Sequence, residues 1–251
     1  MNTDIFGLKH VLLLLACTVF IVLSLMILKK KNVKLETVFK LLLIVGIVSE
    51  TIKVLTYIVV NEDKYFGYLP KTDLPFHLCS IQIIFTLILN LIKNKEIKRT
   101  LLAFMLPTCL IGGIAALLLP TSSARTMWMI TIQYFLYHSA IIIFAIYLYL
   151  TDEIKFEFKD YKKALLCLFA MAFIAIYLNS WIYDGNESEV GNTAINFMYV
   201  VSPPMNGLPY LNKDNGWLVY FIHYGFLAVF ALTMCYIKPV VNKVKTCIKR
   251  A

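Results

Sequence analysis

His77 and Cys79 carry the side chains of a base and a nucleophile, and they stand two positions apart. They lie in residues 73–82 (DLPFHLCSIQ), at the start of an apolar segment that runs to about Ile92. A cysteine near a histidine in a low-dielectric site is the minimal thiol nucleophile with its base, because the imidazole accepts the thiol proton and later protonates the leaving group. Ser80 is an alternative nucleophile. Such residues are costly in a membrane-spanning helix, so the stretch is a functional-site candidate.

A second histidine and a charged pair are expected at a similar depth. His138 falls about 18 Å into its own apolar segment, where a histidine must face the bundle interior or a polar cavity. Tyr134, four residues earlier, shares its helix face. The structural alternative is a histidine locked by a tyrosine or a carbonyl. Glu50 and Lys53 stand at i and i+3, so they share a face and either neutralise each other or mark a site.

The polar side chains of the apolar segments gather toward one side of the membrane. The four histidines are all expected in the outer half or near the midplane, whereas the inner halves of the spans contain few polar side chains. This asymmetry predicts a polar cavity that opens toward the outside or the outer leaflet. Trp217 and Tyr220 also fit an interfacial aromatic belt. The further supporting candidates are Gln82, Asn196, Tyr199, Trp217, Tyr220 and His223.

Four classes of function could use such a cavity, and the residues support them to different degrees. Acyl transfer or ester hydrolysis on a lipid is the natural reaction, because the site is expected at the depth of acyl esters. Three histidines with Glu50 could hold zinc, but the sequence contains no HExxH or CxxC pattern, so we predict no metal and no cofactor. A retinal protein is disfavoured, because the seventh apolar segment contains no lysine. The remaining alternative is an outward-facing small-molecule binding protein or transporter that uses Glu50 and Lys53.

The composition is typical of a polytopic membrane protein. The 251 residues are 60% hydrophobic and 16% charged, and a span needs about 20 apolar residues. We predict an all-α, seven-transmembrane-helix bundle in a single membrane domain, residues 1–251. Its expected spans are 8–28, 37–60, 74–92, 100–119, 126–150, 163–181 and 216–237.

The connections between the spans differ in character. The connection 151–162 has alternating charges and is expected to be a solvated segment. The outer loop 183–215 contains the apolar run 194–201, which is followed by two prolines. This pattern predicts a short re-entrant element that ends at the prolines and covers the outer side of the bundle.

The distribution of Lys and Arg predicts the orientation in the membrane. Seventeen of the 24 lie in alternate connections and the C-terminal tail, and five lie on the other side. Because positive residues favour the cytoplasmic side, we expect the N-terminus outside and the C-terminus inside. The net charge of +9 therefore reflects topology, and nucleic-acid binding is excluded as an explanation of it. Of the six cysteines, five fall within the expected spans, one lies in the C-terminal tail and none lies in an outer loop, so disulfides are not expected.

Two motifs resemble those of a known family. The residues 74–79 (LPFHLC) resemble the LPLHLC signature of the YwaF-like bacterial integral membrane proteins. The run 196–199 (NFMY), Pro203 and the segment 216–220 (GWLVY) resemble that family's NYMYL…KP…GPWPWY region. The sequence departs from it at Phe197 and Ser202, where the family has tyrosine and lysine, and at 218–219, where the family has Pro-Trp.

The resemblance carries an expected activity and location. The YwaF-like family is similar to an animal multi-pass membrane protein described as a phospholipid acyltransferase or transacylase that works through a cysteine and a histidine. It also resembles the androgen-induced-type hydrolases of fatty-acid esters, which use a threonine and a histidine. The likeness implies Cys79 as nucleophile, His138 as base, and a place in a bacterial plasma membrane.

These observations combine into one hypothesis. An acyl group passes through Cys79, and His138 acts as base and then as acid, with membrane lipids as the partners. His77, Gln82 or Asn196 would donate a hydrogen bond to the oxyanion, a contribution often worth about 3–4 kcal/mol.

Overall fold

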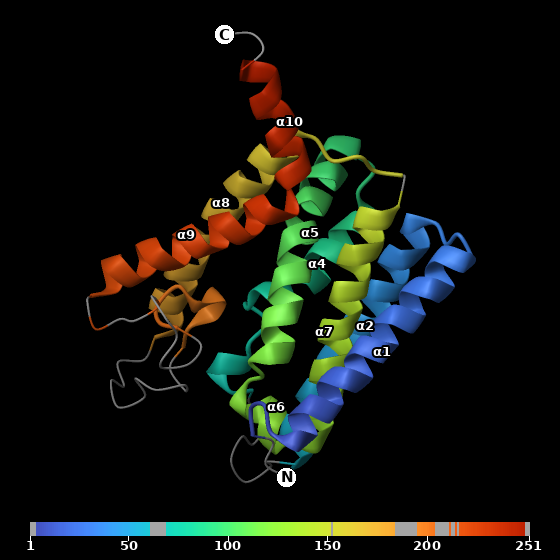
Figure 1. Cartoon of the computed structure of the whole chain (residues 1–251). Coiled ribbons are helices and arrows are strands. Elements are labelled where there is room, and N and C mark those ends of the chain that lie inside the picture. The colour runs from blue at the N-terminus through green and yellow to red at the C-terminus, as the bar shows by residue number, and fades with distance from the viewer. Residues whose placement is uncertain are drawn as a thin grey trace.

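The computed structural model describes residues 4–60, 69–151, 153–183, 195–203, 211, 214 and 216–248. Within these ranges every regular element is a helix, which confirms the all-α prediction. The elements, in chain order, are α1 (Leu8–Lys30), α2 (Leu35–Val60), η1 (Lys71–Asp73), α4 (Leu78–Leu91), α5 (Lys95–Leu118), α6 (Ser122–Thr126), α7 (Trp128–Leu150), α8 (Phe158–Ile182), η3 (Phe197–Tyr199), α9 (Trp217–Cys235) and α10 (Ile237–Ile248) (Figure 1).

Each predicted span overlaps one of these helices. Among the described helices, α1, α5, α7, α8 and α9 are long and apolar enough to cross a membrane. The helix α4 is a shorter apolar helix of 14 residues. The protein is therefore a multi-pass membrane protein. Figure 1 shows α1 beginning at one end of the bundle and α10 leaving at the opposite end.

The helix ends differ from the predicted boundaries for local reasons. Helix α4 begins at Leu78 and not at 74, because the residue before a proline is disfavoured in a helix, and both Leu74 and the N-cap His77 have an extended backbone. His77 therefore precedes the helix instead of lying in its first turn. Helix α5 starts earlier than predicted, since Asn94 Oδ1 accepts from two N–H groups of the first turn, at 2.9 and 3.1 Å.

The segment 151–162 is predicted to be a solvated connection, and this prediction is wrong for its last residues, 158–162, which belong to a helix. Helix α8 begins at Phe158, where Glu157 and Asp160 form a capping box. The Asp160 side chain is fully buried, and Arg99 of α5 donates two hydrogen bonds of 2.7 Å to it. This ion pair joins α5 to α8 at the basic end of the bundle.

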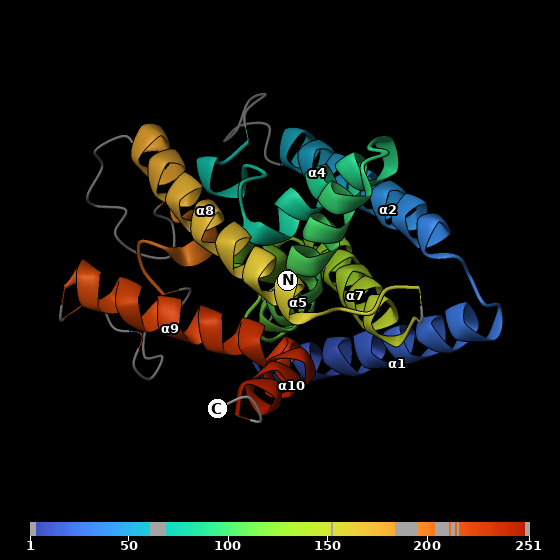
Figure 2. The same cartoon turned by 90° about the horizontal axis from the view of Figure 1, so that it is seen from above.

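Helices α5 and α7 occupy the centre of the bundle. Helix α7 packs against α1, α2 and α5, and α5 packs against α4, α7, α8 and α9. The view from above shows α8 and α9 on one side of α5, and α1 and α2 beside α7 on the other (Figure 2). Gly113 permits the close approach of the central pair, because a Cβ there would lie 2.6 Å from Ile142 Cγ1 and 3.2 Å from the His138 carbonyl.

Candidate functional site

Cys79 is the second residue of α4, directly after the N-cap His77. Its side chain is half-buried, which by itself opposes ionisation of the thiol. The first N–H groups of a helix have no carbonyl partner within the helix, and they carry the positive end of its dipole. A thiolate at this position is therefore favoured over one in the middle of a helix.

His138 presents one free nitrogen from the middle of α7. Its Nδ1 lies 2.7 Å from the Tyr134 carbonyl, which can only accept, so Nδ1 carries the hydrogen. Nε2 is then an acceptor, and it is buried without a hydrogen-bond partner among the described residues. The side chain is only 3% exposed and its ring packs on Tyr134 at 4.1 Å between centroids. His138 is thus held as a neutral imidazole with an open base nitrogen.

Tyr137 links the start of α4 to the face of α7 that carries His138. Its hydroxyl donates to the Cys79 carbonyl at 2.8 Å, and its ring lies 5.7 Å from that of His138. The expected nucleophile and the expected base therefore share Tyr137 as a neighbour. Within the described residues no hydrogen bond joins the Cys79 thiol to His138 Nε2. That they react as a pair remains a prediction.

His77 lies at the outer edge of this group. Its Nε2 donates to the Thr72 carbonyl at 3.1 Å, which holds the turn before α4. The ring packs against Phe197 and Tyr199 of η3, at 5.3 and 5.8 Å between centroids. The ring of His77 therefore ties the start of α4 to η3.

Glu50 and Lys53 form the expected ion pair, at 2.7 Å. Lys53 Nζ also donates to the Asp73 carbonyl at 2.8 Å, and the Tyr57 hydroxyl donates to the Asp73 carboxylate. The pair is thus neutralised and ties α2 to the turn before α4.

The run 194–201, for which a re-entrant element is predicted, contains the short turn η3 within the described residues. Asn179 of α8 holds Phe197 by two hydrogen bonds, 2.7 Å from its N–H and 3.2 Å to its carbonyl. Asn196 closes the turn, since its Oδ1 accepts from Val201 N–H at 3.0 Å and its Nδ2 donates to the Ser202 carbonyl at 2.7 Å.

The backbone of η3 is strained and is held by aromatic side chains of α9. Met198 and Tyr199 have φ of 57° and 54°, a left-handed conformation that costs a non-glycine residue about 1–2 kcal/mol. Tyr220 and Tyr224 donate to the carbonyls of Tyr199 and Met198, at 2.5 and 2.9 Å. Trp217 Nε1 donates to the Val200 carbonyl at 3.0 Å.

The chain matches the model of the TMEM164 family over residues 5–236. It belongs to the TMEM164 family. Comparison with curated proteins and with solved structures gave no match. The matched range includes α4, α7, η3 and α9, so the whole candidate site lies within the part that defines this membrane protein as a member of the TMEM164 family.

One of the predicted features of this TMEM164-family chain is wrong in detail. Tyr220 is fully buried against η3, so it is no member of an interfacial belt. The four histidines differ in their surroundings. His223 is exposed on α9. His10 is buried with both ring nitrogens engaged, one by Phe6 N–H at 2.9 Å and the other by the Leu117 carbonyl at 2.8 Å, which is a structural role.

The three expected oxyanion donors are already engaged. Gln82 Nε2 donates to the Leu78 carbonyl and to Thr108 Oγ1, both at 3.1 Å. Asn196 Nδ2 donates to the carbonyl and the hydroxyl of Ser202, and the ring N–H of His77 is directed at a carbonyl. None of the three side chains of this TMEM164-family protein is therefore available as an oxyanion donor in this arrangement. The bond from Gln82 to Thr108 had no signal in the sequence, because Thr108 lies on another helix, α5.

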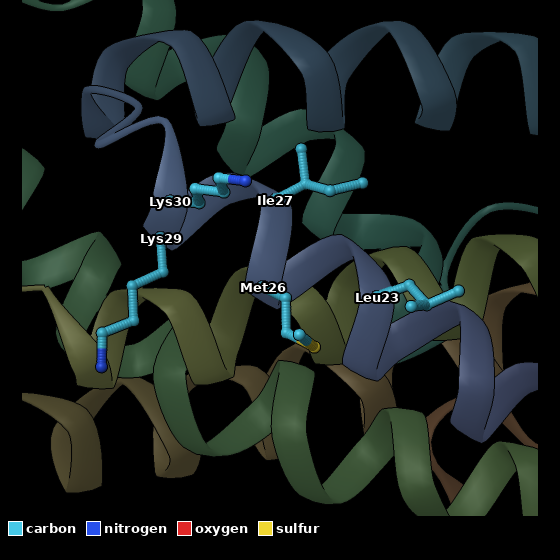
Figure 3. A pocket seen from close by; sticks show the side chains of 5 residues that line it. All are labelled: Leu23, Met26, Ile27, Lys29 and Lys30. Atoms are coloured by element: carbon cyan, nitrogen blue, oxygen red, sulfur yellow. The ribbon is translucent and has the colours of Figure 1, made fainter.

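No metal centre marks the site within the described ranges. These residues contain no group of three or more His, Cys, Asp or Glu side chains that could hold a metal ion. A hollow of about 460 Å³ lies at the C-terminal end of α1 (Figure 3). It is lined by Leu23, Met26, Ile27, Lys29 and Lys30, and it includes none of the predicted site residues.

Proposed function

We propose that this protein is a membrane lipid acyltransferase, transacylase or ester hydrolase in which Cys79 is the nucleophile and His138 the general base. One observation carries the proposal: His138 Nε2 is a buried acceptor whose tautomer is set by the bond from Nδ1 to the Tyr134 carbonyl. A base oriented in this way needs no third residue beyond the helix backbone to hold its ring.

The first half-reaction transfers the acyl group to the protein. His138 Nε2 takes the thiol proton as the Cys79 sulfur attacks the ester carbonyl of the donor. The carbon–sulfur bond forms, the carbon–oxygen bond breaks, and His138 returns the proton to the leaving oxygen. The N–H groups at the start of α4 favour the thiolate, and they are also our proposed oxyanion donors in place of Gln82, Asn196 and His77.

The second half-reaction releases the acyl group. The hydroxyl of an acceptor lipid, or water, gives its proton to His138 Nε2 and attacks the thioester carbonyl. The carbon–sulfur bond breaks and the sulfur takes the proton back from His138. An acceptor lipid makes the protein a transferase, and water makes it a hydrolase.

The setting of the site follows from the sequence pattern. We propose seven spans with the N-terminus outside and the C-terminus inside, which places Cys79 and η3 toward the outer leaflet. The resemblance of the LPFHLC segment to YwaF-like proteins supports a bacterial plasma membrane as the location, with membrane lipids as the partners.

Covalent labelling tests the proposal. Membranes that contain the protein are treated with a lipid-like ester probe that reacts with thiols and hydroxyls. We expect labelling of the wild type that is lost in Cys79→Ala and in His138→Ala. The control is Cys167→Ala, which removes a partly buried cysteine on α8 and leaves labelling intact. Wild-type labelling at Cys79 no stronger than at the other cysteines would contradict the proposal.

The second candidate is an outward-facing binding protein or transporter, supported by the ion pair of Glu50 and Lys53 within the bundle. It predicts thermal stabilisation by a small-molecule ligand that survives Cys79→Ala and is lost in Glu50→Gln. Thermal unfolding with a panel of small polar ligands, on both variants, separates this candidate from the enzyme.

A further inference from the structure

Gln82 carries a second buried acceptor without a partner. Its side chain is 1% exposed, and Nε2 uses both hydrogens on the Leu78 carbonyl and Thr108 Oγ1. Because the carbonyl can only accept, the amide cannot be turned the other way round. Oε1 is therefore the free atom, and it has no hydrogen-bond partner within the described part of the chain.

Gln82 lies on the same face of α4 as Cys79, one turn further along the helix. Buried polar atoms in proteins are paired in the great majority of cases, and an unpaired one is costly. Gln82 Oε1 and His138 Nε2 both lack a donor. A molecule that enters this site and pairs both atoms must therefore bring hydrogens.

We infer that Gln82 Oε1 binds a hydroxyl of the acyl acceptor, and that the acceptor carries two O–H groups close together. This rests on the proposed function. The ester group of the donor offers only acceptor oxygens, so this group cannot pair with Oε1. In the second half-reaction His138 takes the proton of the attacking hydroxyl, which leaves Gln82 to hold another hydrogen. Water and vicinal diols of the glycerol type provide both hydrogens, and a lone alcohol provides one.

The chemical step balances with these groups. The attacking hydroxyl oxygen bonds to the thioester carbon, and its proton moves to His138 Nε2. The carbon–sulfur bond breaks, and the Cys79 sulfur takes that proton. Gln82 exchanges no proton and orients the acceptor through the second hydroxyl. It is a substrate-binding residue for the second half-reaction, and the first half-reaction does not need it.

A pair of acceptors that differ by one methyl group tests the inference. The full-length protein in detergent is acylated with p-nitrophenyl octanoate, and acyl-Cys79 is followed by intact mass. Its decay is compared with 1-O-octylglycerol and with 1-O-octyl-2-O-methylglycerol. We expect the diol to react about tenfold faster in the wild type, and we expect Gln82→Met to lose this preference, since the hydrogen bond from the second hydroxyl to Oε1 is removed. Formation of acyl-Cys79 by Gln82→Met is measured in the same experiment and reports that the variant is folded.

The matched control is Thr86→Val, which removes another buried polar atom four residues further along α4 and keeps the preference for the diol. Equal rates with the two acceptors in the wild type would overturn the inference while the acyl-enzyme stands. A Gln82→Met variant that keeps the preference for the diol and is only slower in both half-reactions would also overturn the inference.

Failure to form acyl-Cys79 would instead overturn the proposed function. Binding then decides the inference separately. Stabilisation of the wild type by 1-O-octylglycerol above the methyl ether, lost in Gln82→Met, supports the hydroxyl site without any chemistry. Equal stabilisation by the two compounds rejects it.

Discussion

The contact between α5 and α7 makes a sharp prediction, because two adjacent glycines differ completely in their surroundings. An added Cβ at Gly113 would lie 2.6 Å from Ile142 Cγ1 and 3.2 Å from the His138 carbonyl oxygen, whereas one at Gly112 meets nothing within 4 Å. Ile142 is buried at 4% exposure, so its side chain has little room to turn away. A side chain at position 113 must therefore push α7 away from α5, whereas one at position 112 meets no steric resistance.

The magnitudes can be compared. Alanine gains about 1 kcal/mol over glycine in a helix interior, and overpacking costs about 1–3 kcal/mol. We therefore expect Gly112→Ala to stabilise by up to ~1 kcal/mol and Gly113→Ala to lie about 1–3 kcal/mol below it. Because His138 is in the displaced segment, Gly113→Ala also lowers probe labelling of Cys79 and Gly112→Ala does not.

Thermal unfolding of both variants in one detergent measures the difference. The double variant Gly113→Ala with Ile142→Ala should recover part of the loss, because the clashing Cγ1 is gone, and a double-mutant cycle isolates the coupling. If both glycine variants raised the unfolding temperature equally, the close approach of α5 and α7 that positions His138 would be refuted.

The remaining predictions concern η3 and the buried ion pair. Asn179→Ala leaves the N–H and carbonyl of Phe197 unpaired, which costs η3 at least about 2 kcal/mol, so amide exchange in 195–203 should rise about thirtyfold. Tyr220→Phe removes one bond to η3 and should raise the same exchange by up to about tenfold, since one bond is worth about 0.5–1.5 kcal/mol. Asp160→Asn breaks the bidentate pair with Arg99, and a drop of about 3 kcal/mol in the free energy of unfolding is expected by denaturant titration.

Matched variants separate these effects from general loosening. Asn90→Ala removes an asparagine of α4 whose side chain bonds only to the Thr86 carbonyl among the described contacts, and it should leave exchange in 195–203 unchanged. Glu96→Gln removes an exposed ion pair with Lys163 and should hardly change unfolding. A response of η3 to Asn90→Ala as large as to Asn179→Ala would contradict its attachment to α8.

Local spacing gave the correct predictions. The ion pair of Glu50 and Lys53 and the stacking of Tyr134 on His138 depend on residues three and four positions apart, and helix geometry determines such pairs without tertiary information. The apolar runs predicted the helices for the same reason, since hydropathy along the chain is a local property. The start of α4 lies four residues later than predicted, because the hydropathy of the apolar run does not show that Leu74, before Pro75, and His77 are extended.

Contacts between distant segments had no signal in the sequence. The bond from Tyr137 to Cys79 joins residues 58 apart, and the bond from His10 to Leu117 joins residues 107 apart. Their formation depends on which helix faces meet. The sequence does not mark Tyr224 as a residue of the site, because its role depends on this packing of helix faces. It stands one turn after Tyr220, and its hydroxyl donates to the carbonyl of Met198.

Counting donors and acceptors therefore distinguishes residues that the sequence treats alike. His10 and His138 are both buried histidines in apolar helices, yet His10 has both ring nitrogens paired and His138 has one. A histidine with both nitrogens paired is part of the packing, because any proton transfer would break an existing bond. A buried nitrogen that accepts nothing has been desolvated without compensation, and such a cost is common at sites that bind or react. The same argument selects Oε1 of Gln82 and rejects its Nε2, so it reverses the role that the sequence had suggested for that residue.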